Sequence, residues 1–132
     1  MKLMLAYIAG PYRDGRGEWY IGQNILAAEA VRDELVKLDV GVLCPHSNSA
    51  FCGGLASDDY WLTLGLTLLD RCDCVVVCPC YRRSMGTLAE IKRARAFSIP
   101  VFFWPEDREK LLQMRHYYVT ETEGMDIAGR IA

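Results

Sequence analysis

A hydroxyl, a glycine and a carboxylate follow an apolar run at residues 74–78. They are Ser84, Gly86 and Glu90. The order predicts a buried strand that leads through a short loop into a helix capped by Ser84. Free backbone N–H groups at a helix start favour an anion, and a carboxylate one and a half turns later could act as nucleophile or base. The segment therefore offers an anion site at Ser84, Met85 and Gly86 beside a reactive Glu90.

Glu90 has two interpretations at this stage. In the second turn of the predicted helix, the helix dipole should lower the pKa of its carboxyl group and keep it ionised. Alternatively, it is a surface glutamate that pairs with Arg93 or Arg95. The residues alone leave both open.

A second polar segment follows the first apolar run, residues 3–9. Gly10 would let a ligand approach the backbone closely, Tyr12 could stack on a base, and Arg13 could meet a phosphate. The segment is not a G-x-G-x-x-G fingerprint, so dinucleotide binding has weak support. The alternative is an ordinary turn at the end of a strand.

Predicted strands alternate with predicted helices. The strands cover residues 3–9, 40–44, 74–78 and 101–104, and the helices cover 18–37, Asp58 or Asp59 to about 71, 84–97 and 107–114. Residues 45–57 are expected to form a long loop, and 117–120 an edge strand followed by a final helical turn. The pattern predicts one α/β domain over residues 1–132, a flavodoxin-like, Rossmann-like three-layer sandwich with a mainly parallel sheet of four to five strands. Its first and third strands would flank the switch point where such sheets bind ligands.

The composition argues against two classes of partner, nucleic acid polymers and membranes. The 132-residue chain has a net charge of −2 and a pI near 5.7, which argues against a nucleic acid polymer as partner. No apolar run approaches the roughly 18 residues of a membrane span, and no signal peptide is recognisable. We therefore expect a cytoplasmic protein without a membrane partner.

Six cysteines leave three alternatives. Most lie in or beside predicted strands, where reduced thiols pack as small apolar side chains, and this interpretation is favoured. Disulfides are the second alternative. The third is a metal site from Cys44-Pro45-His46 and Cys78-Pro79-Cys80, but one-residue spacings are unlike structural zinc sites. No metal is therefore expected.

Three motifs together carry a resemblance. Tyr7-Ile8-Ala9-Gly10-Pro11, Cys72-Asp73 before the third strand, and Ser84-x-Gly86-x-x-x-Glu90 resemble the nucleoside 2-deoxyribosyltransferase-like superfamily. That superfamily includes deoxynucleoside 5′-monophosphate N-glycosidases and small uncharacterised phage and bacterial relatives. The resemblance covers roughly residues 3–104.

The resemblance implies specific roles. Glu90 would be the nucleophile that attacks the anomeric carbon of a nucleoside and forms a covalent glycosyl-enzyme intermediate. Serine at position 84, where transferases often carry an acidic residue, implies a phosphate contact and hydrolysis of a nucleoside 5′-monophosphate. The substrate would be a small-molecule nucleoside or nucleotide, no metal or organic cofactor would be needed, and a homodimer or higher homo-oligomer is expected. The apolar edge at residues 102–104 is a candidate for the subunit interface.

One position departs from the resemblance. Relatives usually carry an acidic residue eight positions before the aspartate that opens the third strand, and here that position is Gly65. Asp59 could reach the pocket in its place. The alternative function is therefore a catalytically weak or inactive nucleotide-binding module, and a flavodoxin-like domain with no nucleotide role is a third hypothesis. Two further side chains have plain interpretations, Asp73 as a polar group in the turn before the third strand and His46 as a solvated loop histidine.

Overall fold

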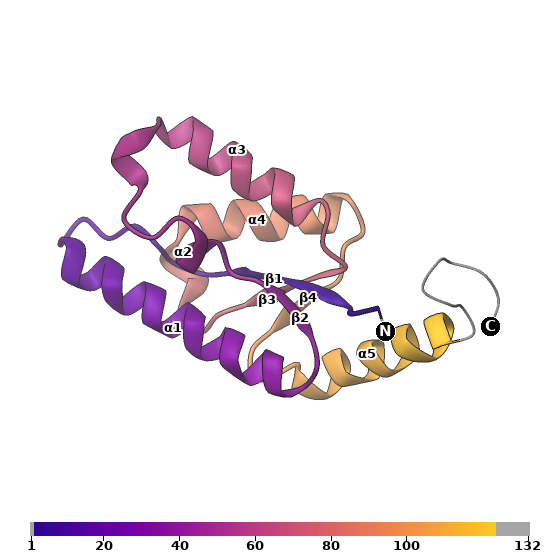
Figure 1. Cartoon of the computed structure of the whole chain (residues 1–132). Helices are drawn as coiled ribbons and strands as arrows, with labels where there is room; N and C mark the ends of the chain where they lie inside the picture. The colour runs from indigo at the N-terminus through magenta and orange to yellow at the C-terminus, as the bar shows by residue number, and fades with distance from the viewer. Residues whose placement is uncertain (1, 124–132) are drawn as a thin grey trace.

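A parallel sheet of four strands forms the centre of the protein (Figure 1). The computed structural model describes residues 2–123. The strand order is β2–β1–β3–β4, formed by β1 (Leu5–Ala9), β2 (Gly41–Leu43), β3 (Cys74–Val77) and β4 (Val101–Phe103). All pairings are parallel, with Ala6 opposite Cys74 and Val75 opposite Val101. The predicted α/β class and flavodoxin-like order are confirmed.

Helices cover both faces of this sheet. In Figure 1, α1 (Glu18–Lys37) and α5 (Arg108–Glu123) lie on one face, and α3 (Asp58–Leu69) and α4 (Met85–Ala96) lie on the other. The short helix α2 (Pro45–Asn48) follows β2, and two single 3₁₀ turns span Gly53–Leu55 and Tyr81–Arg83. The result is the predicted three-layer sandwich.

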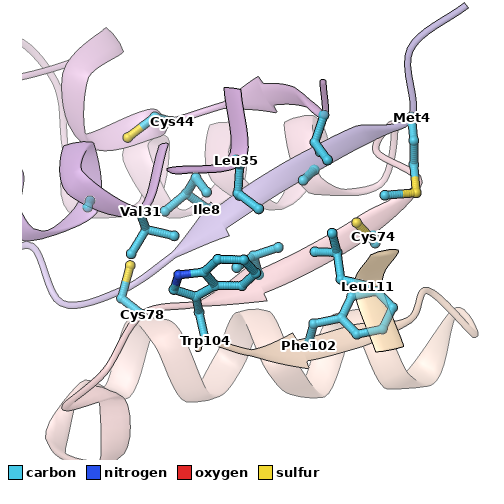
Figure 2. Close-up of a cluster of buried hydrophobic side chains, with 14 residues drawn as sticks. Met4, Ile8, Val31, Leu35, Cys44, Cys74, Cys78, Phe102, Trp104 and Leu111 are labelled. Carbon is cyan, nitrogen blue, oxygen red and sulfur yellow. The ribbon is translucent and has the colours of Figure 1, made fainter. Parts of the chain in front are cut away.

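The alternation of side chains along β1 divides the core in two. Ala6 and Ile8 pack with Val31 and Leu35 of α1 on one face, as Figure 2 shows for Ile8. Tyr7 and Ala9 point to the opposite face, where they pack with residues of α3 and α4. β1 therefore delivers the Tyr7 side chain to the layer that contains the predicted helix of Glu90.

The apolar edge at residues 102–104 belongs to the core of this chain. Phe102 and Trp104 are buried against α1 and α5, with Leu111 beside them (Figure 2). The expectation that this edge forms a subunit interface is therefore wrong for these two side chains. They were ambiguous because a short apolar run does not reveal which helix covers it.

Two boundaries differ from the prediction. Residues 45–57 contain α2 and a 3₁₀ turn instead of a continuous loop. Helix α3 is capped by Ser57, whose side chain accepts a hydrogen bond from the Tyr60 N–H at 3.2 Å, and not by Asp58 or Asp59. Serine is as good an N-cap as aspartate, so the sequence did not separate these neighbours.

The expected edge strand at residues 117–120 is wrong, because α5 runs through it. Leu111, Met114 and Tyr118 recur at helical spacing and pack on the core beside Val42. This packing outweighs the strand preference of Tyr117, Tyr118 and Val119. The remainder of the tail, beyond residue 123, lies outside the described residues.

Most of the cysteines are buried thiols. All six cysteines are free, and Cys44, Cys72, Cys74 and Cys78 are buried. Burial raises the pKa of the Cys72 thiol to about 11 and that of Cys74 to about 12, which keeps them protonated.

Within residues 2–123, none of the helices has the length and apolar character needed to cross a bilayer.

Asp73 connects the residues before β3 to the first residue of β1 through two hydrogen bonds. Its carboxylate accepts a hydrogen bond from the Leu5 N–H at 2.7 Å, and its own N–H donates to the Leu5 carbonyl at 2.8 Å. The plain structural interpretation of Asp73 therefore holds.

Asp73→Ala should lower the free energy of unfolding by about 1–3 kcal/mol, because the Leu5 N–H loses its partner. Asp33→Ala, on an exposed pair with Arg32, should change it by less than about 0.5 kcal/mol in the same urea titration.

Candidate active site

One cavity of about 480 Å³ opens at the carboxyl ends of β1 and β3. Its walls come from four segments far apart in the sequence. The lining includes Tyr7, Gly10, Tyr12 and Arg13 from β1 and its loop, His46 from α2, Asp58, Asp59, Trp61 and Gly65 from α3, and Ser84, Met85, Gly86, Thr87 and Glu90 from α4 and its cap. Every residue proposed for the site from sequence therefore lines the same cavity. This is the edge where open α/β sheets bind ligands.

The start of α4 is built as predicted. Ser84 caps the helix, and its hydroxyl oxygen accepts hydrogen bonds from the Thr87 N–H at 3.2 Å and the Thr87 hydroxyl at 2.8 Å. A hydroxyl that accepts twice still has its own proton to donate to an anion. Met85 and Gly86 are exposed, so the N–H end of the helix is open to a ligand. Thr87 is fully buried, and no residue pattern predicts its contact with Ser84.

Glu90 faces inward because of its place on α4. Thr87, Ile91 and Ala94 form the buried face of the helix, and Glu90 lies one turn beyond Thr87 on the cavity side. The Tyr7 hydroxyl lies beside this carboxylate and interacts with it from β1. Arg93 pairs instead with Asp70 of α3 at 2.7 Å. The alternative of a surface glutamate paired with Arg93 is therefore wrong.

Burial controls the charge of Glu90. Loss of solvent raises the pKa of its carboxyl group from 4.5 to about 7, against the opposing effects of the Tyr7 hydrogen bond and the His46 charge. The expectation that the helix terminus would lower this pKa is wrong, because desolvation is the larger effect. Burial and Glu90 together raise the pKa of Tyr7 well above its usual range, so its hydroxyl stays a donor.

Gly65 lies directly over the Tyr7 hydroxyl. A Cβ atom at this position would lie 3.0 Å from the hydroxyl oxygen, which is tighter than ordinary contact. Helix α3 therefore passes Tyr7 and the neighbouring Glu90 at a point where it carries no side chain. The departure at position 65 thus lies against the Tyr7 hydroxyl.

Gly10 is explained by packing. A Cβ atom there would lie 2.9 Å from the Cys78 sulfur, so the chain after β1 can pass the end of β3 only as glycine. The predicted reason, a close approach by a ligand, is not needed for this position. Gly10 still forms part of the cavity wall.

Tyr12 and Arg13 lie at the mouth of the cavity and connect the segments around it. The Tyr12 hydroxyl accepts a hydrogen bond from the Phe51 N–H at 2.8 Å, which ties the loop after β1 to the loop before α3. Arg13 forms an exposed ion pair with Asp58 at 2.5 Å across the mouth. Such a pair is worth at most about 1 kcal/mol, so an anionic ligand can displace it. Asp59 is exposed beside it at the start of α3.

His46 is the residue that sequence reasoning placed wrongly. It is only 5% exposed, and its Nε2 atom lies 3.0 Å from the carbonyl oxygens of both Gly10 and Pro11. Nε2 must therefore carry the proton that it donates to them. His46 joins α2 to the loop after β1, and its Nδ1 atom is buried without a hydrogen-bond partner among the described residues. The only available signal was its position directly after a strand and a proline.

A family model described as a domain of unknown function, DUF4406, matches residues 4–103. The chain belongs to this family. The DUF4406 match contains all four strands and every cavity residue named above, and it ends before α5. No curated protein matches the chain.

Substitution of two helical glycines should separate packing from helix propensity. Gly22→Ala on α1, where a Cβ atom meets nothing within 4 Å, should raise the free energy of unfolding by about 0.5–1 kcal/mol. Gly65→Ala should fail to give this gain, because the new methyl group presses on the buried Tyr7 hydroxyl. Urea titration of both variants measures the difference. An equal gain in both would contradict the close contact between α3 and Tyr7.

Glu90 should make stability depend on pH. The folded state holds its proton up to about pH 7 and the unfolded state only to about pH 4.5, so the folded state binds more protons between these values. The contribution of Glu90 is therefore fully present below pH 4.5 and is lost as the pH rises to 7, by at most about 3 kcal/mol, because the half-buried side chain keeps some contact with solvent. Urea titrations from pH 4 to 8 should show this fall in the wild type relative to Glu90→Gln. A constant difference between the two proteins would show that Glu90 is not buried.

Proposed function

We propose that this DUF4406 domain cleaves the N-glycosidic bond of a nucleoside or nucleoside 5′-monophosphate, with Glu90 as the nucleophile. The observation that supports it most is the contact between the Tyr7 hydroxyl and the Glu90 carboxylate inside the cavity. The matching family is a nucleoside 2-deoxyribosyltransferase-like domain, although its description names no function. The resemblance drawn from the sequence motifs implies the same role for Glu90.

The geometry suits carboxylate attack on a sugar. Glu90 lines the cavity beside the Tyr7 hydroxyl, so one carboxylate oxygen can interact with this hydroxyl while the other attacks an anomeric carbon. Tyr7 is thus a positioning residue. Attack forms a sugar ester on Glu90 and releases the base, and water or a second base then takes the sugar. The two steps need no metal or organic cofactor.

The anion end of the substrate would lie at the start of α4. The Ser84 hydroxyl and the N–H groups near Met85 and Gly86 suit a 5′-phosphate, with Arg13 able to leave Asp58 for it. Tyr12 and Gly10 would form the opposite wall. We further propose that the protein acts as a homodimer or higher homo-oligomer.

A second candidate function is nucleotide binding without turnover. Gly65 favours it, because α3 provides no carboxyl group beside Tyr7 and Glu90. The two candidates share the pocket and differ only in chemistry.

Release of free base separates these functions. The wild type, mixed with a panel of nucleosides and nucleoside 5′-monophosphates, should release base detectable by chromatography. Glu90→Gln keeps the shape of the side chain and should reduce the rate on the order of 10³-fold or more, because the nucleophile is lost. Tight binding with no release from either protein would favour the binding module. No binding of any nucleoside or nucleotide would exclude both functions.

Ser84→Asp tests the phosphate contact without removing the helix cap. Aspartate caps helices as well as serine does, so stability should change little. Its carboxylate should repel a 5′-phosphate, so kcat/KM for monophosphates should fall at least about tenfold while kcat/KM for nucleosides is kept. Equal loss for both substrate classes would contradict a phosphate at Ser84.

A further inference from the structure

We propose that the preferred substrate carries a base that is already positively charged, such as a pyridinium ring or an N7-alkylated purine. This inference rests on the proposed function and specifies its substrate class. A neutral base departs as an anion unless an acid protonates it, and such an acid contributes about 10²–10⁴-fold to the rate. A cationic base departs as a neutral molecule and needs no proton. The question is therefore which described side chain of the cavity could supply one.

His46 cannot reach the leaving base. Its Nε2 proton is donated to the carbonyls of Gly10 and Pro11, each at 3.0 Å. Its Nδ1 atom has essentially no exposed surface and so does not face the open cavity. The histidine holds two loops together and is not available as an acid.

Tyr7 is committed to the nucleophile. Its hydroxyl interacts with the Glu90 carboxylate, and its proton is held more tightly than in a free tyrosine because burial raises its pKa. Transfer of this proton to a base would leave a phenolate beside the carboxylate in a buried site. Two neighbouring negative charges of this kind are strongly unfavourable.

Helix α3 offers no buried acid. At Gly65, the point of closest approach to Tyr7, it has no side chain. The two carboxyl groups that α3 brings to the cavity, Asp58 and Asp59, lie at its exposed start, and Asp58 is paired with Arg13. Both side chains lie in solvent at the mouth of the cavity, away from the point where α3 passes Tyr7. They would instead attract a cationic ring to this side of the cavity.

A cationic substrate would also ionise Glu90. Burial raises the pKa of this carboxyl group to about 7, so a large share of the free protein holds it protonated and unreactive at neutral pH. A positive charge bound within a few ångströms stabilises the carboxylate form. The substrate would thereby generate its own nucleophile, which a neutral nucleoside cannot do.

The reaction balances without an acid. A Glu90 oxygen bonds to the anomeric carbon as the carbon–nitrogen bond breaks, and the bonding electron pair goes to the ring, which loses its positive charge. Water then bonds to the anomeric carbon, the ester bond to Glu90 breaks, and the second proton of the water passes to solvent. Each turnover therefore releases one proton to the medium.

A matched pair of nucleotides tests the inference. 7-Methylguanosine 5′-monophosphate and guanosine 5′-monophosphate differ by one methyl group and one charge, and nicotinamide mononucleotide supplies a pyridinium ring. Each is assayed in its ribose and 2-deoxyribose forms, with the rate of spontaneous release subtracted. We expect kcat/KM for the cationic member to exceed that for the neutral member by about 10²-fold or more, with one proton released per base. Asp59→Asn should raise KM for the cationic substrates several-fold more than KM for the neutral ones.

The outcomes separate the two proposals. Equal cleavage of the neutral and cationic members, lost in Glu90→Gln, would overturn the charged-base inference and leave the glycosidase function intact. Failure of all substrates to release base in a Glu90-dependent way would overturn both. Gly65→Asp adds a carboxyl group beside Tyr7, so the ratio of kcat/KM for the cationic nucleotide to that for the neutral one should fall. Gly65→Ala is the control for the effect of the added Cβ atom on packing. If Gly65→Asp folds and this ratio of kcat/KM values is unchanged, the absence of an acid at position 65 does not explain the preference for a charged base.

Discussion

A half-buried carboxyl group placed beside a tyrosine hydroxyl is the constraint around which this molecule is arranged. Tyr7 must leave the sheet toward α3 and α4, which the alternation of β1 ensures, and Glu90 must lie one turn beyond Thr87, which the Ser84 cap ensures. α3 must then pass the Tyr7 hydroxyl without a side chain, which Gly65 allows. Each condition is local, and together they place a half-buried carboxylate at the switch point of the sheet.

The elements around this pair act mainly by excluding water and fixing loops. Gly10 lets the chain pass Cys78, His46 holds the carbonyls of Gly10 and Pro11, and Tyr12 ties the loop before α3. The same exclusion of water that raises the pKa of Glu90 strengthens every electrostatic contact inside the cavity. The protonation state of Glu90 therefore depends on what enters the cavity, and in the proposed function this would couple binding to reactivity.

Much of this arrangement could be predicted from sequence because it depends on local signals. The four strands, their order, the Ser84 cap and the gathering of the two loops follow from apolar runs, helix caps and the rules of parallel sheets. The burial of His46, the pairing of Arg93 with Asp70 and the raised pKa of Glu90 depend on contacts across tens of residues, which no local pattern reports. The helix through residues 117–120 was missed because core packing, not local propensity, decides it.

The central claim is that Glu90 bonds to the sugar. The most direct test is mass spectrometry of the protein quenched during turnover of a nucleoside 5′-monophosphate, followed by peptide mapping. A glycosyl-enzyme intermediate on Glu90 would add the mass of one sugar phosphate to the peptide that contains Glu90, and Glu90→Gln would show no such adduct. A sugar adduct on a peptide without Glu90, or base release by Glu90→Gln at the wild-type rate, would contradict it.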